Sequence, residues 1–455
     1  MTASNSSGSS TLRRVVLLAF PLILSNLTQP LLASVDTILS GHLPSAAALG
    51  GVAMGGLFFN AIFWSFGFLR MGTTGLVAQA HGAGDEDELA VHVVRGFALA
   101  LGLGLAAVLL RTPLVALALH LLGGSAQAQA QAEIYCRIRI WSAPAALANY
   151  VVLGTLLGKQ RARSALLLQA SIQVINIAVA LGLVLGAHWA VAGIAAATLV
   201  AEWCGCLLGV ALLAHTMHWQ HLPWSRFGER EGLYRLFALN RDILLRTVSL
   251  VAAYGWFTRS GARAGDAVLA ANAVLLNLQA IASYGLDGFA NATEALVGEA
   301  IGAHNQQQYR AVLRASTQAA GLAAAVFSLL FWALGVHMVH WFTNQAPVAD
   351  LAIRYLPWVI ALPLIAVWGF QLDGVFIGAT RSRDLRNSMI ISLAGFLALS
   401  AVLERAMGNN GLWLAFTGFM ALRGVTLSLR LKGILQHICD ISAVPADVNA
   451  AADAL

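Results

Sequence analysis

The chain contains long apolar stretches such as Phe20–Asp36, which reads FPLILSNLTQPLLASVD and carries one charge, at its end. A bilayer core about 30 Å thick is crossed by roughly 20 mainly apolar residues in a helix. Continuous apolar runs of this length therefore predict membrane-spanning helices. They exclude a porin-type barrel, because the strands of such a barrel alternate between apolar and polar residues.

The composition of the whole chain points the same way. Of its 455 residues, 58% are hydrophobic and 11% are charged, whereas soluble domains carry roughly 25% charged residues. A soluble multidomain enzyme is therefore excluded, and the apolar content is enough for about twelve spans. Because short loops account for the net charge of +6, we expect no nucleic-acid partner.

The apolar runs predict an all-α integral membrane protein with twelve spans. The predicted ranges are 14–39, 46–70, 90–110, 132–156, 164–186, 190–215, 235–260, 267–290, 309–338, 348–378, 385–403 and 411–431. Most basic residues fall in the loops between an even and an odd helix, including a basic segment from Arg226 to Arg246 that we expect on the cytoplasmic surface. The positive-inside rule then predicts a bacterial inner-membrane protein with both termini in the cytoplasm.

Three motifs recur at an offset of 220 residues. Ser40-Gly41 returns as Ser260-Gly261, the motif LVxxAxGA at 76–83 returns at 296–303, and GxxRxR at 158–163 returns at 378–383. Three matches in one register predict a duplication. Six helices per copy give both halves the same orientation, so their pseudo-twofold axis lies along the membrane normal.

The duplication predicts five regions. They are a disordered cytoplasmic N-terminus (1–12), a six-helix lobe (13–216), a cytoplasmic linker (217–234), a second six-helix lobe (235–433) and a cytoplasmic tail (434–455). We expect a cavity between or within the lobes.

Asp36 is the sharpest functional candidate, because a charge inside a membrane span is costly. No Lys or Arg lies within fifteen residues of it, and Gln29 falls on nearly the same helical face. Pro21 and Pro30 each remove a backbone hydrogen bond, so the first helix can bend. The alternative is a carboxylate at the outer interface that reaches water.

Two further helices carry polar residues at a similar depth. Asn176 on the fifth helix lies about 15 Å below the outer surface, and Thr198 on the sixth lies about 12 Å below it. With Asp36 they predict one hydrated cavity, to which Gln29 and Asn149 also contribute. Simple hydrogen bonding between helices is the alternative.

Several segments resemble multidrug and toxic compound extrusion (MATE) transporters of the DinF-like branch. They are the segment Pro21–Gly41 with its P-x14-D-T-x-x-x-G pattern, LRMGTTGLVAQA at 69–80, LNRDILLR at 239–246, LDGFA at 286–290 and LDGVFIGATR at 372–381. The resemblance spans nearly the whole chain, from Leu12 to Leu431. It implies an exporter that exchanges amphiphilic, often cationic, compounds for protons or sodium ions, with Asp36 as the principal coupling residue.

The chain departs from its relatives at one position. The resemblance implies an Asn-x-x-x-Asp on the fifth helix and a Thr on the sixth; Asn176 and Thr198 match, but Ala180 stands in place of the second Asp. A sodium ion needs several oxygen ligands, preferably with full charge. A lone carboxyl in apolar surroundings instead favours its protonated form. We therefore expect proton coupling, with sodium coupling as the alternative.

Other charged residues have less specific interpretations. Asp287 and Asp373 fall within about five residues of the cytoplasmic ends of the eighth and tenth helices, and Arg70 lies near the same face; they are candidates for a gate, a proton relay or helix capping. Glu202 is either an inner-cavity carboxylate or structural. Twelve histidines and four cysteines show no ligand spacing, so we expect no metal and no cofactor.

We therefore predict a secondary active multidrug antiporter that works by alternating access, as a monomer among membrane lipids. A lipid-linked saccharide flippase is the rival transporter, and it requires basic residues in the cavity to hold a pyrophosphate. An intramembrane enzyme is disfavoured because no His-Glu-x-x-His or Gly-x-Ser-x-Gly motif is present. A passive channel suits the duplication and the single buried carboxylate less well than a carrier does.

Overall fold

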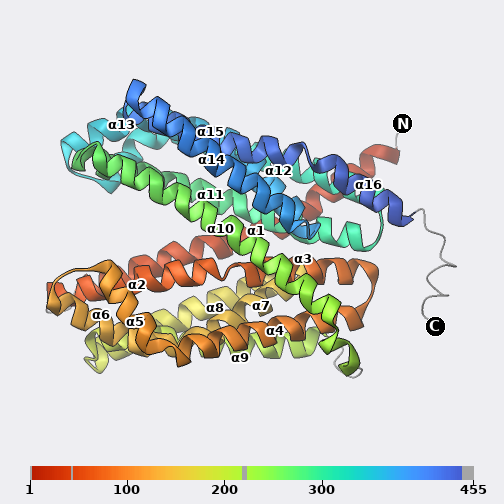
Figure 1. Cartoon of the computed structure of the whole chain (residues 1–455), viewed down its shortest axis with the longest axis horizontal. Coiled ribbons are helices and arrows are strands. Elements are labelled where there is room, and N and C mark those ends of the chain that lie inside the picture. The colour runs from red at the N-terminus through yellow and green to blue at the C-terminus, as the bar shows by residue number, and fades with distance from the viewer. Residues whose placement is uncertain (1–2, 42–44, 218–222, 443–455) are drawn as a thin grey trace. The chain divides into compact units, whose positions relative to one another are not determined.

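The computed structural model describes residues 3–41, 45–217 and 223–442, and the regular elements within these ranges are helices (Figure 1). The first half of the chain contains α1 (Ala3–Gly41), α2 (Ala46–Ser65), α3 (Phe68–Ala83), α4 (Glu86–Leu109), α5 (Arg111–Leu122), α6 (Ala126–Arg139), α7 (Ala143–Gly158), α8 (Ala162–Leu181) and α9 (Ala190–Thr216). The second half contains α10 (Arg230–Arg263), α11 (Asp266–Gly302), α12 (Gln306–Phe342), α13 (Ala346–Gly378), α14 (Ser382–Met407), α15 (Asn409–Ser428) and α16 (Leu431–Ser442).

The described residues contain eleven helical stretches that are long and apolar enough to cross a membrane. Three of these stretches combine consecutive α-helices: α2 with α3, α6 with α7, and α15 with the start of α16. The twelfth span is α10, whose 34 residues include charged residues at both ends that lower its mean hydropathy. The chain is therefore an all-α, multi-pass membrane protein, as predicted.

Several predicted helix ends are wrong. The span predicted at 46–70 breaks after Ser65, where Gly67 allows the chain to leave the helix before α3 begins. The helix predicted to end at residue 290 continues as α11 to Gly302, because no proline interrupts it. Residues 3–12, predicted to be disordered, form the first turns of α1, since each added helical residue gains a hydrogen bond.

The fourth span is also interrupted. A short 3₁₀ segment, Ile140–Ser142, separates α6 from α7, and Pro144 occupies the first turn of α7. Proline is accommodated at a helix start because its missing N–H would have no helical partner there. The break brings Arg139, the last residue of α6, into the interior of a span of 33 residues, Ala126–Gly158.

Backbone details repeat at the same offset of 220 residues as the sequence motifs. Gln160 and Thr380 both have positive φ, 57° and 54°, at the ends of α7 and α13. Asp85 and Asn305 both cap the following helix by accepting a hydrogen bond from the N–H three residues later, at 2.8 and 2.9 Å. The duplication inferred from three motifs thus extends to turns and caps.

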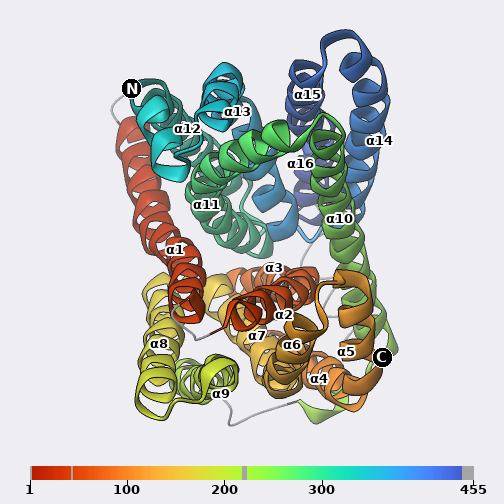
Figure 2. The same cartoon turned by 90° about the vertical axis from the view of Figure 1, so that its left-hand side faces the viewer.

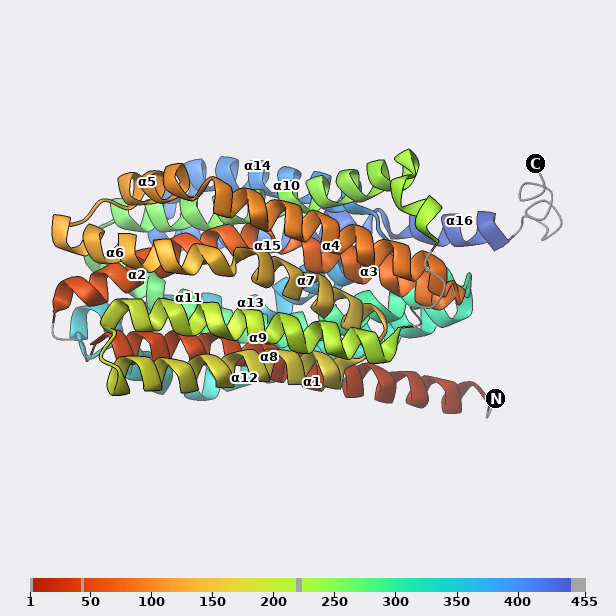
Figure 3. The same ribbon diagram turned by 90° about the horizontal axis from the view of Figure 1, so that it is seen from below.

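The chain forms two compact units. Unit 1 contains residues 1–23, 78–84 and 238–455, and unit 2 contains residues 24–77 and 85–237. In unit 1, α11 packs against α12 and α13, and α14 packs against α15 (Figure 2). In unit 2, α2 packs against α6, α4 against α7, and α8 against α9 (Figure 3).

Aromatic side chains fill the core of unit 1. The Phe257 ring lies 4.9 Å from the Trp413 ring and 5.0 Å from the Phe416 ring, between centroids, in tilted or edge-on arrangements. Such offset geometries are the favourable ones for aromatic pairs. Unit 2 has a smaller aromatic group, in which Phe59 lies 6.4 Å from Tyr135.

Within unit 1, the end of α3 crosses the end of α11 at glycines. A Cβ atom on Gly82 would lie 2.1 Å from the carbonyl oxygen of Glu299, and a Cβ atom on Gly302 would lie 1.9 Å from that of Gln79. Each of these two contacts joins one copy of the repeat to the other, because Gly82 corresponds to Gly302 and Gln79 to Glu299 at the offset of 220. The contact is therefore reciprocal, as in a twofold interface.

Further contacts support this crossing. A Cβ atom on Gly298 would lie 2.5 Å from the Cβ of Ala78, and these two positions also correspond in the repeat. The Gln79 side chain donates a hydrogen bond from Nε2 to the Gly378 carbonyl oxygen at 2.9 Å. Small residues allow two helices to approach closely enough for backbone contact.

Candidate functional site

The first helix positions the residues predicted to couple ions. α1 continues through Pro21 and Pro30 and ends at Gly41. The side chains of Gln29, Pro30 and Asp36 lie outside the described part of the structure, so their predicted roles stay predictions.

The structure brings Asn176 and Thr198 together in unit 2. Asn176 Nδ2 donates a hydrogen bond to Thr198 Oγ1 at 3.0 Å, and Thr198 Oγ1 donates to the Ile194 carbonyl oxygen at 3.3 Å. Both side chains are buried, with exposures of 1% and 3%. The two residues therefore lie at one depth between α8 and α9, as the helix positions predicted.

This pair leaves one polar atom without a partner. Asn176 Oδ1 is buried and accepts no hydrogen bond from the described residues. One turn further along α8, Ala180 is completely buried. The position one turn along α8 therefore carries no charge, and the described residues leave Asn176 Oδ1 as an unused acceptor. The π-helical residues Gly182–Gly186 end this helix.

Asn149 and Glu202 form a second polar pair in unit 2. Asn149 Nδ2 donates to Glu202 Oε2 at 2.8 Å and to the Glu202 carbonyl oxygen at 3.0 Å. Asn149 is buried on α7, and Glu202 is half-buried on α9, one turn from Thr198. The sequence suggested both residues but gave no sign that they are partners.

Arg139 is a residue that the sequence interpretation missed, because it falls inside the predicted span 132–156 but was not named as a site candidate. Its guanidinium donates to the Tyr135 hydroxyl at 2.9 Å and lies over the rings of Phe59 and Phe63, at 5.3 and 5.9 Å from their centroids. A cation over aromatic rings is attracted by their negative faces. The sequence signal was Tyr135 four residues earlier, on the same helical face.

In unit 1, Asp373 is held by two arginines. Asp373 Oδ2 accepts from Arg423 at 2.7 Å and also from Arg246. Asp373 lies five residues before the end of α13, as predicted. The expectation that the basic segment ending at Arg246 lies on the surface is wrong for Arg246 itself, which is 8% exposed. It is buried because α10 begins at Arg230 and has made four turns by this residue.

The remaining predicted residues, Asp287 and Arg70, lie on α11 and α3. Asp287 lies fifteen residues before the end of α11, so its placement near a helix end is wrong; the reason is the extension of α11 to Gly302. Asp287 and Arg70 are both half-buried. The Arg70 carbonyl oxygen accepts from the Thr74 hydroxyl at 2.9 Å in α3.

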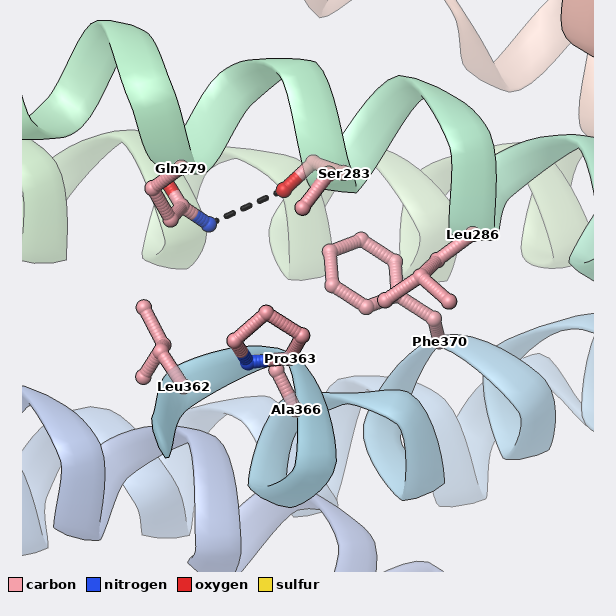
Figure 4. A pocket seen from close by; sticks show the side chains of 8 residues that line it. Gln279, Ser283, Leu286, Leu362, Pro363, Ala366 and Phe370 are labelled. Carbon is pink, nitrogen blue, oxygen red and sulfur yellow. Dashed lines mark hydrogen bonds between the residues drawn. The ribbon is translucent and has the colours of Figure 1, made fainter. Parts of the chain in front are cut away.

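A small cavity lies between α11 and α13 in unit 1 (Figure 4). Gln279 Nε2 donates to Ser283 Oγ at 2.9 Å on one wall, and the Tyr254 hydroxyl donates to Gln279 Oε1 at 3.3 Å. The remaining lining is apolar and consists of Ala282, Leu286, Leu362, Pro363, Ala366 and Phe370.

The sequence comparison decides the family. A family model described as MatE matches residues 21–181 and 249–404. The chain belongs to the MATE family. The DNA damage-inducible protein F of Escherichia coli is 44% identical over 413 residues, which cover 90% of each chain. The probable multidrug resistance protein NorM of Acinetobacter baylyi is 24% identical over 92% of this chain and 95% of that protein.

Solved structures show the same fold for this MATE chain. A crystal structure described as MATE in the bent conformation has a TM-score of 0.87 and 19% identity, and it covers 96% of this chain and 99% of the other. An outward-facing multidrug resistance MATE family transporter has a TM-score of 0.85 and 18% identity over 94% and 97% of the two chains.

Family membership makes this protein a transporter and not an enzyme. Across the part of this MATE chain that the structure describes, no three His, Cys, Asp or Glu side chains gather as a metal site.

Proposed function

We propose that this MATE transporter exports small amphiphilic, often cationic, compounds from the cytoplasm in exchange for protons that bind Asp36. Its family and the multidrug names of relatives support efflux of toxic compounds. The proposal includes a bacterial inner-membrane location with both termini in the cytoplasm, which rests on the distribution of basic loops.

The observation that supports proton coupling is the unused acceptor on Asn176. Its buried Oδ1 accepts no hydrogen bond from the described residues, and Ala180 supplies no second carboxylate. A protonated carboxyl can donate a hydrogen bond to such an oxygen, whereas an ionised one cannot. A sodium ion would need several oxygen ligands and favours full negative charge, and the loss of one carboxylate weakens such a site.

The transport cycle follows from these properties. In the outward-open state a proton neutralises Asp36, which weakens the hold on a cationic substrate and lets α1 rearrange about Pro21 and Pro30. The two lobes, 13–216 and 235–433, then rock to the inward-open state, where the proton leaves. Exchange of one proton for one monovalent cation moves no net charge, so it would use only the pH gradient; each uncompensated charge would be worth about 2.3 kcal/mol per 100 mV.

The other polar residues have supporting roles in this proposal. Gln29, Asn149, Asn176 and Thr198 supply hydrogen bonds to the cavity, and Glu202 is a second carboxylate held by Asn149. We assign Arg70, Asp287 and Asp373 to gating.

The test is efflux of a cationic dye from vesicles under a pH gradient or a sodium gradient, imposed separately. We expect the pH gradient alone to drive efflux in the wild type. Asp36→Asn should lower the rate at least about tenfold, because a typical acid–base group contributes 10²–10⁴-fold. Asp36→Glu should retain part of the rate, and Asp350→Asn, which changes an exposed acid on α13, should behave as wild type.

Two outcomes would contradict the proposal. Proton-driven efflux at the wild-type rate in Asp36→Asn would remove Asp36 from the mechanism. Efflux driven by the sodium gradient alone would establish the sodium-coupled alternative. Counterflow of unlabelled against labelled substrate, which a passive channel does not show, would separate a carrier from a channel.

A lipid-linked saccharide flippase remains the rival function. It must hold a pyrophosphate, which carries at least two negative charges. The buried charged side chains among the described residues of unit 1 are two arginines and three carboxylates: Arg246, Arg423, Asp242, Glu294 and Asp373. They leave no excess positive charge to hold a pyrophosphate, so we expect no flipping of a lipid-linked saccharide in the same vesicles.

A further inference from the structure

We propose that unit 1 contains an anion-binding site at Arg246 and Arg423. The site would take one monovalent anionic group, either a small inorganic anion or the carboxylate or sulfonate head of an amphiphile. This inference goes beyond the proposed export of cationic compounds and does not depend on Asp36.

The charge balance of the cluster is the first argument. Both guanidinium groups donate to the same oxygen of Asp373, and no other acidic side chain of the described residues forms an ion pair with either arginine. The buried carboxylate of Asp242, one helical turn from Arg246, pairs instead with Arg241 and Arg386. Two positive charges and one negative charge therefore leave the three-residue cluster with one uncompensated positive charge. An uncompensated charge at membrane depth is strongly unfavourable, so the cluster favours an added negative group.

The second argument is the unused hydrogen-bonding capacity of both arginines. Arg423 is 2% exposed and Arg246 is 8% exposed, yet the buried Nε of each donates to no acceptor in the described residues. The Arg423 Nη1 atom donates only to the Met420 sulfur at 3.3 Å, which is a weak acceptor. Buried N–H groups of this kind are normally paired, and a carboxylate or sulfonate oxygen is the acceptor that suits a guanidinium.

The third argument is the neighbouring surface. The Arg423 guanidinium lies 5.5 Å from the Phe370 ring centroid, and Phe370 also lines the small cavity between α11 and α13 (Figure 4). Ser283 and Gln279 place polar groups on the opposite wall, whereas Leu362 and the other lining residues are apolar. An anionic group bound near the arginines would therefore border the polar and apolar walls of this cavity, whose volume of about 10 Å³ has room for a water molecule but not for an alkyl tail.

Stacking against aromatic rings does not by itself explain both the charge and the unpaired donors of these arginines. Arg423 also lies 5.9 Å from the Phe419 ring centroid, so aromatic faces offset part of its charge. Arg246 makes no such ring contact in the described structure, and stacking leaves both Nε–H groups unpaired. An anion would satisfy the charge and both donors at once.

The first experiment uses the purified wild-type protein and measures its thermal unfolding midpoint. The midpoint in sodium chloride is compared with that in the same buffer without added salt, with Arg423→Gln as the control for ionic strength. Octane-1-sulfonate is compared with octan-1-ol, which has the same tail without the charge. Stabilisation by octane-1-sulfonate alone would identify the amphiphile head as the ligand, and stabilisation by chloride as well would show that a small anion suffices. Stabilisation by neither anion overturns the proposal.

The second experiment uses Arg423→Gln, which leaves Arg246 and Asp373 as a neutral pair. We expect the anion-dependent rise in the unfolding midpoint to disappear, while proton-driven efflux of a cationic dye stays within twofold of wild type. Arg423→Lys keeps the charge and should keep part of the anion effect. Arg137→Gln, which removes an exposed arginine of α6, is the matched control.

If the anion still raises the unfolding midpoint of Arg423→Gln as it does in the wild type, the proposal is overturned. It is also overturned if the variant loses dye efflux and the anion-dependent rise to the same extent, because that would indicate a structural role for Arg423. If Arg423→Gln does not fold, Arg423→Lys and the wild-type measurement decide. Failure of the proton-coupling proposal would instead appear as an unchanged rate of dye efflux in Asp36→Asn, while the anion still raises the unfolding midpoint.

Discussion

The reciprocal glycine contact between α3 and α11 makes a quantitative prediction. Alanine at Gly302 would place a Cβ 1.9 Å from the Gln79 carbonyl oxygen, and alanine at Gly82 would place one 2.1 Å from the Glu299 carbonyl oxygen. Both obstacles are helix backbone, so rotation of a side chain cannot relieve either clash. The helices must separate, which costs about 1–3 kcal/mol for an overpacked interior.

The opposing term is helix propensity, since alanine in place of glycine gains at most about 1 kcal/mol. No atom lies within 4 Å of a Cβ built on Gly321 in α12, so Gly321→Ala should gain the stability of higher helix propensity without a clash. Because the gain in helix propensity is common to all three variants, it cancels in the comparison, and we expect Gly82→Ala and Gly302→Ala to be less stable than Gly321→Ala by about 1–3 kcal/mol.

The assay is the apparent Tm of the purified variants in one detergent. Each clashing variant should lose several degrees, whereas Gly321→Ala should match or exceed the wild type. The double variant at Gly82 and Gly302 should lose less than the sum of the single losses, because one separation of the helices relieves both clashes. Single variants as stable as Gly321→Ala would refute the close approach, and strict additivity would refute the shared crossing.

Two further predictions concern unit 2. Asn149→Leu removes the donor to Glu202 Oε2. It should cost about 1–3 kcal/mol of stability, because the carboxylate oxygen then lacks its hydrogen-bond partner. Addition of Glu202→Gln should recover part of the loss in apparent Tm, and no recovery would contradict the pairing. Asn176→Ala should lower proton-driven efflux about tenfold at normal expression. Thr417→Val is the control, because it removes a hydroxyl that bonds within its own helix, and it should leave the efflux rate unchanged. Equal efflux rates for both variants would argue against a role for Asn176.

The candidate site was only partly accessible from the sequence. Helix periodicity and distance from the loops were enough to place Asn176 and Thr198 at one depth, and the structure brings them to 3.0 Å. The partners of Asp373 were not accessible in this way, because Arg246 and Arg423 lie 127 and 50 residues away in the chain. The span predicted at 132–156 contains Arg139 without a break, because the interruption at Ile140–Ser142 depends on packing around Pro144 as well as on local sequence.

The sequence by itself determined the class, the number of spans, the duplication and the family. These properties depend on hydrophobic runs about as long as a bilayer is thick and on motifs repeated at 220 residues, and both are local or periodic patterns. Only the tertiary structure decided which charges are neutralised and which donors stay unpaired, because these depend on contacts between helices far apart in the chain. Asp373 illustrates the difference: the sequence marked it as a charge near a helix end, and folding placed it between two arginines.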